Sequence, residues 1–191
     1  METGTETVIL GWPPDGPTLR LDYRRFSYAG KFAMSTTGKA VVRGTDGSER
    51  ETGGEFDDVL AAVAFDADRT DPGTLRLRYV TVRNDRRGEG LGPKLCRFVA
   101  RRAADRGYDR VAIAVNNPFA YEALYRAGFA FTGEETGIAE LVLARPADGP
   151  AEDRSLETYQ EGLDRYRERD LSADERAFLE RKGGSPPPEP R

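Results

Sequence analysis

The sequence predicts an α+β domain with a helical appendage at its C-terminal end. Three observations support this prediction. First, strand-like segments outnumber helical ones before residue 145. Second, the middle of the chain contains a strand that is followed by a glycine loop and a helix. Third, two helical segments stand alone after residue 146. With 191 residues the chain has room for one domain of ordinary size, expected over residues 1–145, and for the appendage, expected over residues 146–191.

The N-terminal part of the sequence shows mainly strand patterns. Leu19, Leu21 and Tyr23 alternate with polar residues, which is typical of a half-buried strand. Residues 44–55 are polar and rich in glycine, so we expect a loop there. Residues 59–65 fit either a helix or a strand, and their position just before another strand favours a strand. The other strands predicted in this part are Val8–Leu10, Phe26–Met34 and Lys39–Arg43.

The stretch Leu75–Gly107 carries the strongest local signal. Leu75–Val82 has closely spaced branched and aromatic residues, which predict a strand. A polar turn with three glycines follows, and from Pro93 onward apolar residues recur at helical spacing. Pro93 suits the first turn of a helix, where no N–H bond is required, and Gly107 suits a helix end.

This strand, loop and helix predict an anion-binding site. The first N–H groups of a helix have no partner within the helix, and its dipole favours negative charge there. Gly88, Gly90 and Gly92 allow the backbone to approach a phosphate, and Arg86 and Arg87 add positive charge. The glycine spacing differs from that of a P-loop and from that of a dinucleotide fold. An ordinary turn with two solvated arginines is the alternative.

After Gly107 the pattern alternates between strand and helix. Arg110–Val115 has the composition of a buried strand. Asn117 suits the N-cap and Pro118 the first residue of a short helix that ends before Gly128. A hairpin is expected from Phe129–Phe131 and Ile138–Ala144.

The C-terminal segment combines a linker, two helices and a tail. Residues 145–153 are rich in proline, glycine and acidic residues. Apolar residues recur at helical spacing over Ser155–Arg169, and Ser172–Glu175 forms a capping box that opens a second helix through Lys182. Both helices are poor in apolar residues, so they either pack on the domain or mediate self-association, for example as a homodimer. Residues 183–191 are proline-rich, and we expect them to be disordered.

The composition excludes several classes of protein. There is no histidine, which excludes Ser-His triads and most zinc sites, so no metal is expected. Cys96 is the single cysteine, which we interpret as a small core residue rather than a nucleophile. The net charge of −4 argues against a nucleic-acid partner. There is neither a basic leader nor an apolar run of about 18 residues, so we expect no membrane partner and a cytoplasmic location.

Two motifs resemble those of one known family. Arg87–Gly92, with the sequence RGEGLG, matches the Arg/Gln-x-x-Gly-x-Gly/Ala acyl-CoA loop of the GCN5-related N-acetyltransferase (GNAT) superfamily. Leu124–Phe129, with the sequence LYRAGF, is similar to the family's Leu-Tyr-x-x-x-Gly-Phe pattern. The likeness covers residues 59–144. It implies a GNAT-like fold, with a mixed, mostly antiparallel, twisted sheet flanked by helices.

The resemblance implies an enzyme that uses acetyl-CoA as co-substrate and transfers its acyl group to an amine. Tyr125 would protonate the departing thiolate, and Tyr121, one turn earlier, is the alternative acid. Core packing is the competing role for both tyrosines, and capping of a helix is the competing role for Asn117. The residues implied to bind the cofactor are Val80, Val82, Arg87, Gly88, Gly90, Leu91, Gly92 and Asn117.

The sequence departs from the family at the position of its usual base. Many members carry a glutamate four residues before the valine that corresponds to Val82, and here that residue is Arg78. The period of two predicts that Arg76, Arg78, Val80 and Val82 share one face of the strand. Two guanidinium groups on that face could bind an acceptor with a carboxylate or phosphate. Solvated arginines are the alternative.

The leading hypothesis is therefore an N-acetyltransferase that moves an acetyl or short acyl group from acyl-CoA to an amine by direct attack. The acceptor could be a small molecule or a peptide, and the sequence does not identify it. A non-catalytic acyl-CoA-binding or interaction module of the same fold is the alternative.

Overall fold

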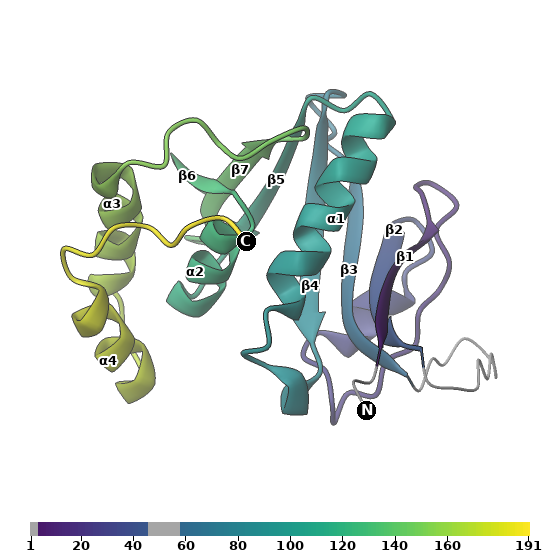
Figure 1. Ribbon diagram of the computed structural model, residues 1–191, viewed down its shortest axis with the longest axis horizontal. Helices are drawn as coiled ribbons and strands as arrows, with labels where there is room; N and C mark the ends of the chain where they lie inside the picture. Colours follow the sequence, from purple (N-terminus) through teal and green to yellow (C-terminus); the bar gives the residue numbers. More distant parts are fainter. Residues whose placement is uncertain (1–3, 46–57) are drawn as a thin grey trace.

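The computed structural model describes residues 4–45 and 58–191, which form a seven-stranded sheet with helices packed against it (Figure 1). The strand order is β1-β2-β3-β4-β5-β7-β6. Strands β4 and β5 are parallel, and all other neighbours are antiparallel, so the prediction of a mixed, mostly antiparallel sheet is confirmed. The strands are β1 (Thr5–Gly11), β2 (Gly38–Gly44), β3 (Val59–Ala67), β4 (Thr74–Val82), β5 (Arg110–Val115), β6 (Ala130–Glu135) and β7 (Leu141–Pro146).

Four α-helices accompany the sheet in the described residues. Helix α1 lies in front of β3 and β4, whereas α3 and α4 lie beyond β6 at the far edge (Figure 1). None of the described helices is long and apolar enough to cross a membrane. The helices are α1 (Leu91–Asp105), α2 (Pro118–Arg126), α3 (Leu156–Arg167) and α4 (Ala173–Lys182), and there are two short 3₁₀ helices, η1 (Ala29–Ala33) and η2 (Asn84–Arg86).

Helix α1 follows from local sequence signals. Leu95, Val99 and Ala103 recur at helical spacing and are buried against the sheet. Pro93 lies in the first turn, as predicted. Gly107 adopts a φ of +85°, the left-handed conformation that glycine accepts readily after a helix end. The predictions for both ends of this helix are therefore confirmed.

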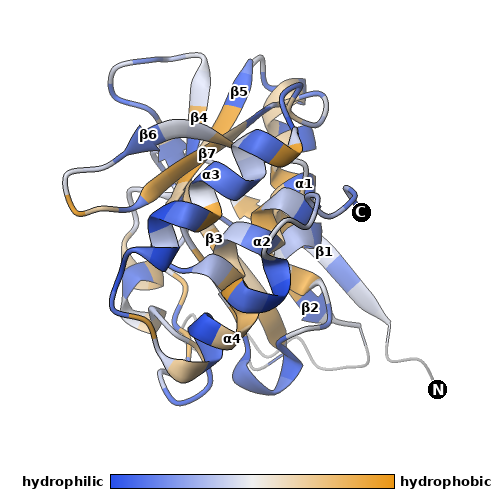
Figure 2. Cartoon of the chain, turned by 90° about the vertical axis from the view of Figure 1, so that its left-hand side faces the viewer, coloured by the Kyte–Doolittle hydropathy of each residue, from blue (hydrophilic) through white to orange (hydrophobic). Residues whose placement is uncertain are grey.

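The sheet separates two hydrophobic cores. The larger core lies between the sheet and α1, α2 and α3, with hydrophobic strands behind helices whose outer faces are hydrophilic (Figure 2). The smaller core lies on the opposite side, where Leu19, Phe26 and Phe32 pack against residues such as Val41 and Ala62. The strands predicted over Leu19–Tyr23 and Phe26–Met34 are wrong, because this segment crosses the sheet as irregular chain with one 3₁₀ helix. Most of the loop predicted over residues 44–55 lies outside the described residues.

The C-terminal helices pack on the domain. Tyr159, Leu163 and Tyr166 of α3 belong to the larger core. Gly162 allows α3 to approach α2 closely, since a Cβ atom there would lie 2.0 Å from the hydroxyl oxygen of Tyr121. The predicted capping box at the start of α4 is present.

The proline-rich tail also contacts the domain. Arg154 donates a hydrogen bond to the Pro188 carbonyl at 2.6 Å, and Gln160 donates one to the Ser185 carbonyl at 2.7 Å. The backbone amide of Arg191 reaches the carbonyl of Arg126 on α2. These contacts connect the tail to α2, to α3 and to the segment that precedes α3.

Candidate active site

The candidate site begins where two parallel strands diverge. Pairing between β4 and β5 runs from Thr74 opposite Arg110 to Leu77 opposite Ile113 and stops there. Strand β4 nevertheless continues to Val82. The edge of β4 beyond Leu77 therefore has no strand partner on the β5 side.

A β-bulge lies at the same point of β4. Across from β3, Ala64 pairs with Tyr79 and Phe65 pairs with Leu77, which leaves Arg78 as a surplus residue. Such a bulge bends its strand and re-aims the side chains that follow it. The divergence from β5 starts directly before this surplus residue.

The bulge reverses the side-chain alternation that the sequence predicts for β4. Leu77 precedes the bulge and Val80 and Val82 follow it, yet all three pack against the larger core. A strand without a bulge would place Leu77 and Val80 on opposite faces. The predicted common face for Arg76, Arg78, Val80 and Val82 is therefore wrong.

Both arginines predicted to bind an acceptor are paired with carboxylates. Arg76 binds Asp68 and does not line the cavity. Its guanidinium holds the pKa of Asp68 below the usual value, chiefly through the hydrogen bond between them. Arg78 does line the cavity, but it binds Asp66 at 2.5 Å. Both guanidinium groups therefore already have a carboxylate partner.

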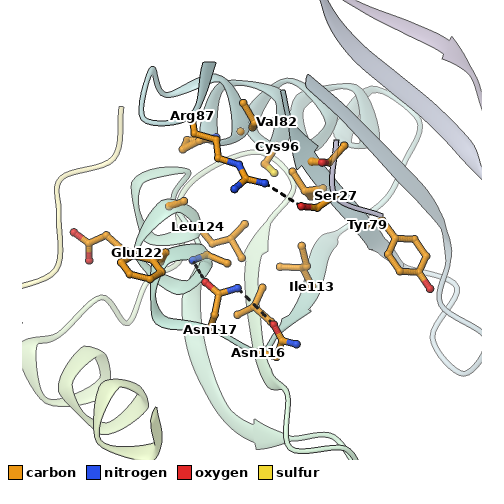
Figure 3. Close-up of a pocket in the computed structure, with 18 of the residues that line it drawn as sticks. Ser27, Tyr79, Val82, Arg87, Cys96, Ile113, Asn116, Asn117, Glu122 and Leu124 are labelled. Carbon is orange, nitrogen blue, oxygen red and sulfur yellow. Dashed lines mark hydrogen bonds between the residues drawn. The ribbon is translucent and has the colours of Figure 1, made fainter. Parts of the chain in front are cut away.

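A cavity of about 890 Å³ opens beside the unpaired edge of β4. Its walls come from β4, the end of β5, the start of α1, the inner side of α2 and the segment around Ser27. Figure 3 shows Arg87 bonded to Ser27 on one side of this cavity and Asn117 on another. The predicted cofactor-binding residues that line it are Val80, Val82, Arg87, Gly88, Gly90, Leu91, Gly92 and Asn117.

The start of α1 presents free backbone amides to this cavity. Gly90 precedes the helix with a φ of +78°, and no side chain caps the helix. In the described part of the chain, no backbone amide from Arg87 to Gly92 donates to another protein group. Arg87 donates to the hydroxyl of Ser27 at 2.9 Å and has no carboxylate partner among the described residues. These are the features that a bound phosphate requires.

The start of α2 forms the opposite wall. The Asn117 side chain accepts a hydrogen bond from the Ala120 amide at 2.8 Å, so its predicted capping role is confirmed. The same side chain lines the cavity with its amide nitrogen directed to Asn116 (Figure 3).

Sequence comparison decides the family. Residues 22–129 match the model of the acetyltransferase (GNAT) family, and this span is more than half of the chain. The chain belongs to the GNAT acetyltransferase family. The glycine loop and the diverging strands described above lie within the matched span.

Several solved structures resemble this GNAT chain at low sequence identity. Nourseothricin acetyltransferase is 22% identical with a TM-score of 0.47, over 58% of this chain and 65% of that one, which is less than two thirds of its length. The IAA acetyltransferase from Bacillus cereus is 19% identical with a TM-score of 0.49, over 75% and 99% of the two chains. A Bacillus subtilis acetyltransferase in complex with CoA is 16% identical with a TM-score of 0.43, over 56% and 75%. No curated protein matches the sequence.

The two tyrosines expected to act as acids lie away from the cavity. Tyr121 and Tyr125 are completely buried on the side of α2 that faces α3 and β6. Tyr125 accepts a hydrogen bond from the Phe131 amide at 3.0 Å, and Tyr121 donates one to the Tyr159 carbonyl at 3.0 Å. Burial raises the pKa of both phenols. The structure therefore gives both tyrosines a role in packing.

A count along the motif explains this placement. The GNAT pattern has three residues between its tyrosine and its glycine, whereas only Arg126 and Ala127 separate Tyr125 from Gly128. The position that corresponds to the family's tyrosine is therefore Leu124, which does line the cavity. Consecutive residues of an α-helix point about 100° apart around its axis. Tyr125 therefore points away from the direction in which Leu124 faces the cavity.

The cavity also contains residues that sequence patterns did not indicate. Ile138 and Glu140 reach it from the β6–β7 turn, and Phe178 reaches it from α4. Thr81 borders it with a buried hydroxyl that has no hydrogen-bond partner in the described part of the chain. Only the tertiary fold brings these residues together. The described residues contain no group of three or more carboxylate or thiol side chains placed to hold a metal ion.

Proposed function

We propose that this protein transfers an acetyl or other short acyl group from acyl-CoA to an amine. One observation carries the proposal: the free amides of Arg87–Gly92 and the unpaired edge of β4 border the same cavity. An acyl-CoA has a diphosphate that suits the amides and an extended amide-containing arm that suits an open strand edge.

The loop and the start of α1 would hold the diphosphate. Backbone amides from Gly88 to Gly92 can donate to its oxygens, and the positive end of the α1 dipole adds to the attraction. Arg87 would contribute a charge-assisted hydrogen bond. The main chain of Val80 and Val82 would bind the pantetheine arm as an additional strand, and Asn117 would bound the cavity on the α2 side.

The amine would attack the thioester carbonyl directly. A C–N bond forms, the C–S bond breaks, and the proton of the amine passes to water. A backbone amide of β4 near Val80 would stabilise the oxyanion that develops on the carbonyl oxygen. The thiolate would take its proton from solvent, because the phenols of Tyr121 and Tyr125 are engaged elsewhere.

No covalent enzyme intermediate is needed in this scheme. Cys96 borders the cavity, but it is only 1% exposed and burial raises the pKa of its thiol to about 12. A thiol of that pKa is almost entirely protonated near neutral pH and is a poor nucleophile.

The experiment combines CoA binding with acyl transfer. Isothermal calorimetry with CoA measures affinity, and release of the free thiol from acetyl-CoA with a panel of amines measures turnover. Replacing Arg87 with alanine should weaken CoA binding about ten- to a hundredfold, the range for a hydrogen bond to a charged group.

Arg83→Ala is the matched control, since Arg83 binds Asp85 and does not line the cavity. It should bind CoA as the wild type does. A wild-type protein that binds no CoA would refute the proposal. Binding of CoA without acyl transfer to any amine would favour the non-catalytic module instead.

A further inference from the structure

Most charges at the cavity are neutralised by partners within the protein. The charged side chains that line the cavity are Arg78, Arg86, Arg87, Glu122, Arg126 and Glu140. A charged side chain that lines the cavity without a partner of opposite charge marks a place where a ligand can supply that partner.

Four of these side chains are in ion pairs. Arg78 binds Asp66 at 2.5 Å, and Arg86 binds Glu89 at 2.7 Å. Glu122 is 4% exposed and lies 2.8 Å from the ammonium of Lys182 and 3.6 Å from Arg126. Tyr159 also donates to Glu122. Each of the four therefore already has a partner of opposite charge, although Lys182 and Arg126 share the single carboxylate of Glu122.

The two side chains left over, Arg87 and Glu140, have opposite signs. Arg87 lies beside the free amides and suits the anionic part of acyl-CoA. Glu140 has no cationic partner for its carboxylate among the described residues. Arg169 comes near, but it donates to the carbonyl of Ala139 and stacks on the ring of Tyr166.

The strand register places Glu140 away from the point where β4 and β5 diverge. Val115 at the end of β5 pairs with Leu141, so Glu140 lies one position further, level with Asn116. The divergence starts at the level of Ile113. Three positions along a strand correspond to about 10 Å. A thioester at the divergence would therefore leave Glu140 to contact a remote part of the acceptor rather than the reacting nitrogen.

We propose that the acceptor carries a second, positively charged group and that Glu140 binds it. The acceptor class is thus a diamine or a longer polycationic amine. This inference rests on the proposed function for the reacting amine, while the recognition of the second charge rests on Glu140 alone. It replaces the anionic acceptor suggested by the arginines of β4.

The test uses the full chain with CoA bound and three amines of equal chain length. Putrescine ends in a second ammonium, n-butylamine in a methyl group and γ-aminobutyrate in a carboxylate. Calorimetry should show that putrescine binds about tenfold more tightly than n-butylamine, and γ-aminobutyrate more weakly than both. Glu140→Gln should abolish the preference for putrescine.

Glu134→Gln provides the control. It removes the same charge from the same hairpin, at an exposed position that does not line the cavity, and should retain the preference for putrescine. The inference is overturned if the wild type binds putrescine no more tightly than n-butylamine, or if Glu140→Gln retains the preference.

Thiol release with acetyl-CoA separates the two proposals. Turnover of amines without a preference for putrescine would refute only the role of Glu140. A preference in binding without any turnover would refute only the transferase activity. An equal loss of turnover for putrescine and n-butylamine in Glu140→Gln would assign Glu140 to proton transfer and overturn the recognition role.

Discussion

Replacing Tyr125 with phenylalanine is expected to lower stability and to leave the rate of acyl transfer unchanged. The hydroxyl of Tyr125 accepts a hydrogen bond from the Phe131 amide at 3.0 Å, and both residues are buried. Removing this acceptor leaves a buried N–H without a partner. The ring itself stays in place, because phenylalanine fills nearly the same volume.

The size of the effect follows from the lost acceptor. An unsatisfied buried donor costs about 1–3 kcal/mol of unfolding free energy. For a protein of this length, each kcal/mol lowers the melting temperature by about 2–4 °C. The variant should therefore melt about 2–12 °C below the wild type. A general acid would behave differently, since its removal typically lowers kcat by about 10²–10⁴.

Thermal unfolding by circular dichroism and thiol release under saturating acetyl-CoA are the two measurements. Tyr166→Phe is the control, because Tyr166 is also buried, lies outside the cavity lining and donates to the Val115 carbonyl at 3.0 Å. Both variants should lose stability and keep kcat. A hundredfold loss of kcat in Tyr125→Phe alone, at an unchanged melting temperature, would refute the packing role and restore the catalytic one.

Three further predictions concern the rest of the fold. Gly162→Ala should lower the unfolding free energy in urea by about 1–3 kcal/mol, because its Cβ would overlap the Tyr121 hydroxyl; a gain in stability would contradict the close packing of α3 on α2. Cys96→Ala should keep full acyl transfer, and rapid alkylation of the wild-type thiol before unfolding would contradict its burial. Asp68→Asn should destabilise the protein at neutral pH. The lowered pKa of Asp68 beside Arg76 means that this difference should shrink as pH falls below about 4, and a gap independent of pH would contradict it.

Local signals predicted those elements whose ends depend on a few neighbouring residues. Pro93 and Gly107 bound α1, Asn117 caps α2, and the capping box at Ser172 opens α4. In each case the physical cause is a hydrogen bond or a backbone conformation set within about one helical turn. Sequence alone is sufficient for such features.

The strand prediction for residues 19–34 is wrong because an alternating apolar pattern has two possible causes. Alternating apolar residues arise in a strand, but they also arise where irregular chain covers a sheet. Leu19 is completely buried, whereas Tyr23 in the same alternation is 75% exposed. Only contact with the other face of the sheet distinguishes the two cases.

The sequence predicts the glycine loop of the site but not the side of the cavity that would bind the acceptor. The loop is a contiguous run of residues with a recognisable spacing. Glu140 enters the cavity from a turn that is distant in sequence, and its importance depends on which other charges happen to be paired. No pattern within the chain encodes that difference.

Because β4 has one surplus residue, the opening beside this strand depends on how many residues β4 contains and not on which residues they are. A substitution of one side chain would not change the number of residues in β4. We therefore expect it to leave the divergence of β4 from β5 unchanged. Deleting Arg78 would join the two halves into a single regular alternation. We expect shortened chains of this kind to lose the opening, which scans of single substitutions would never reveal.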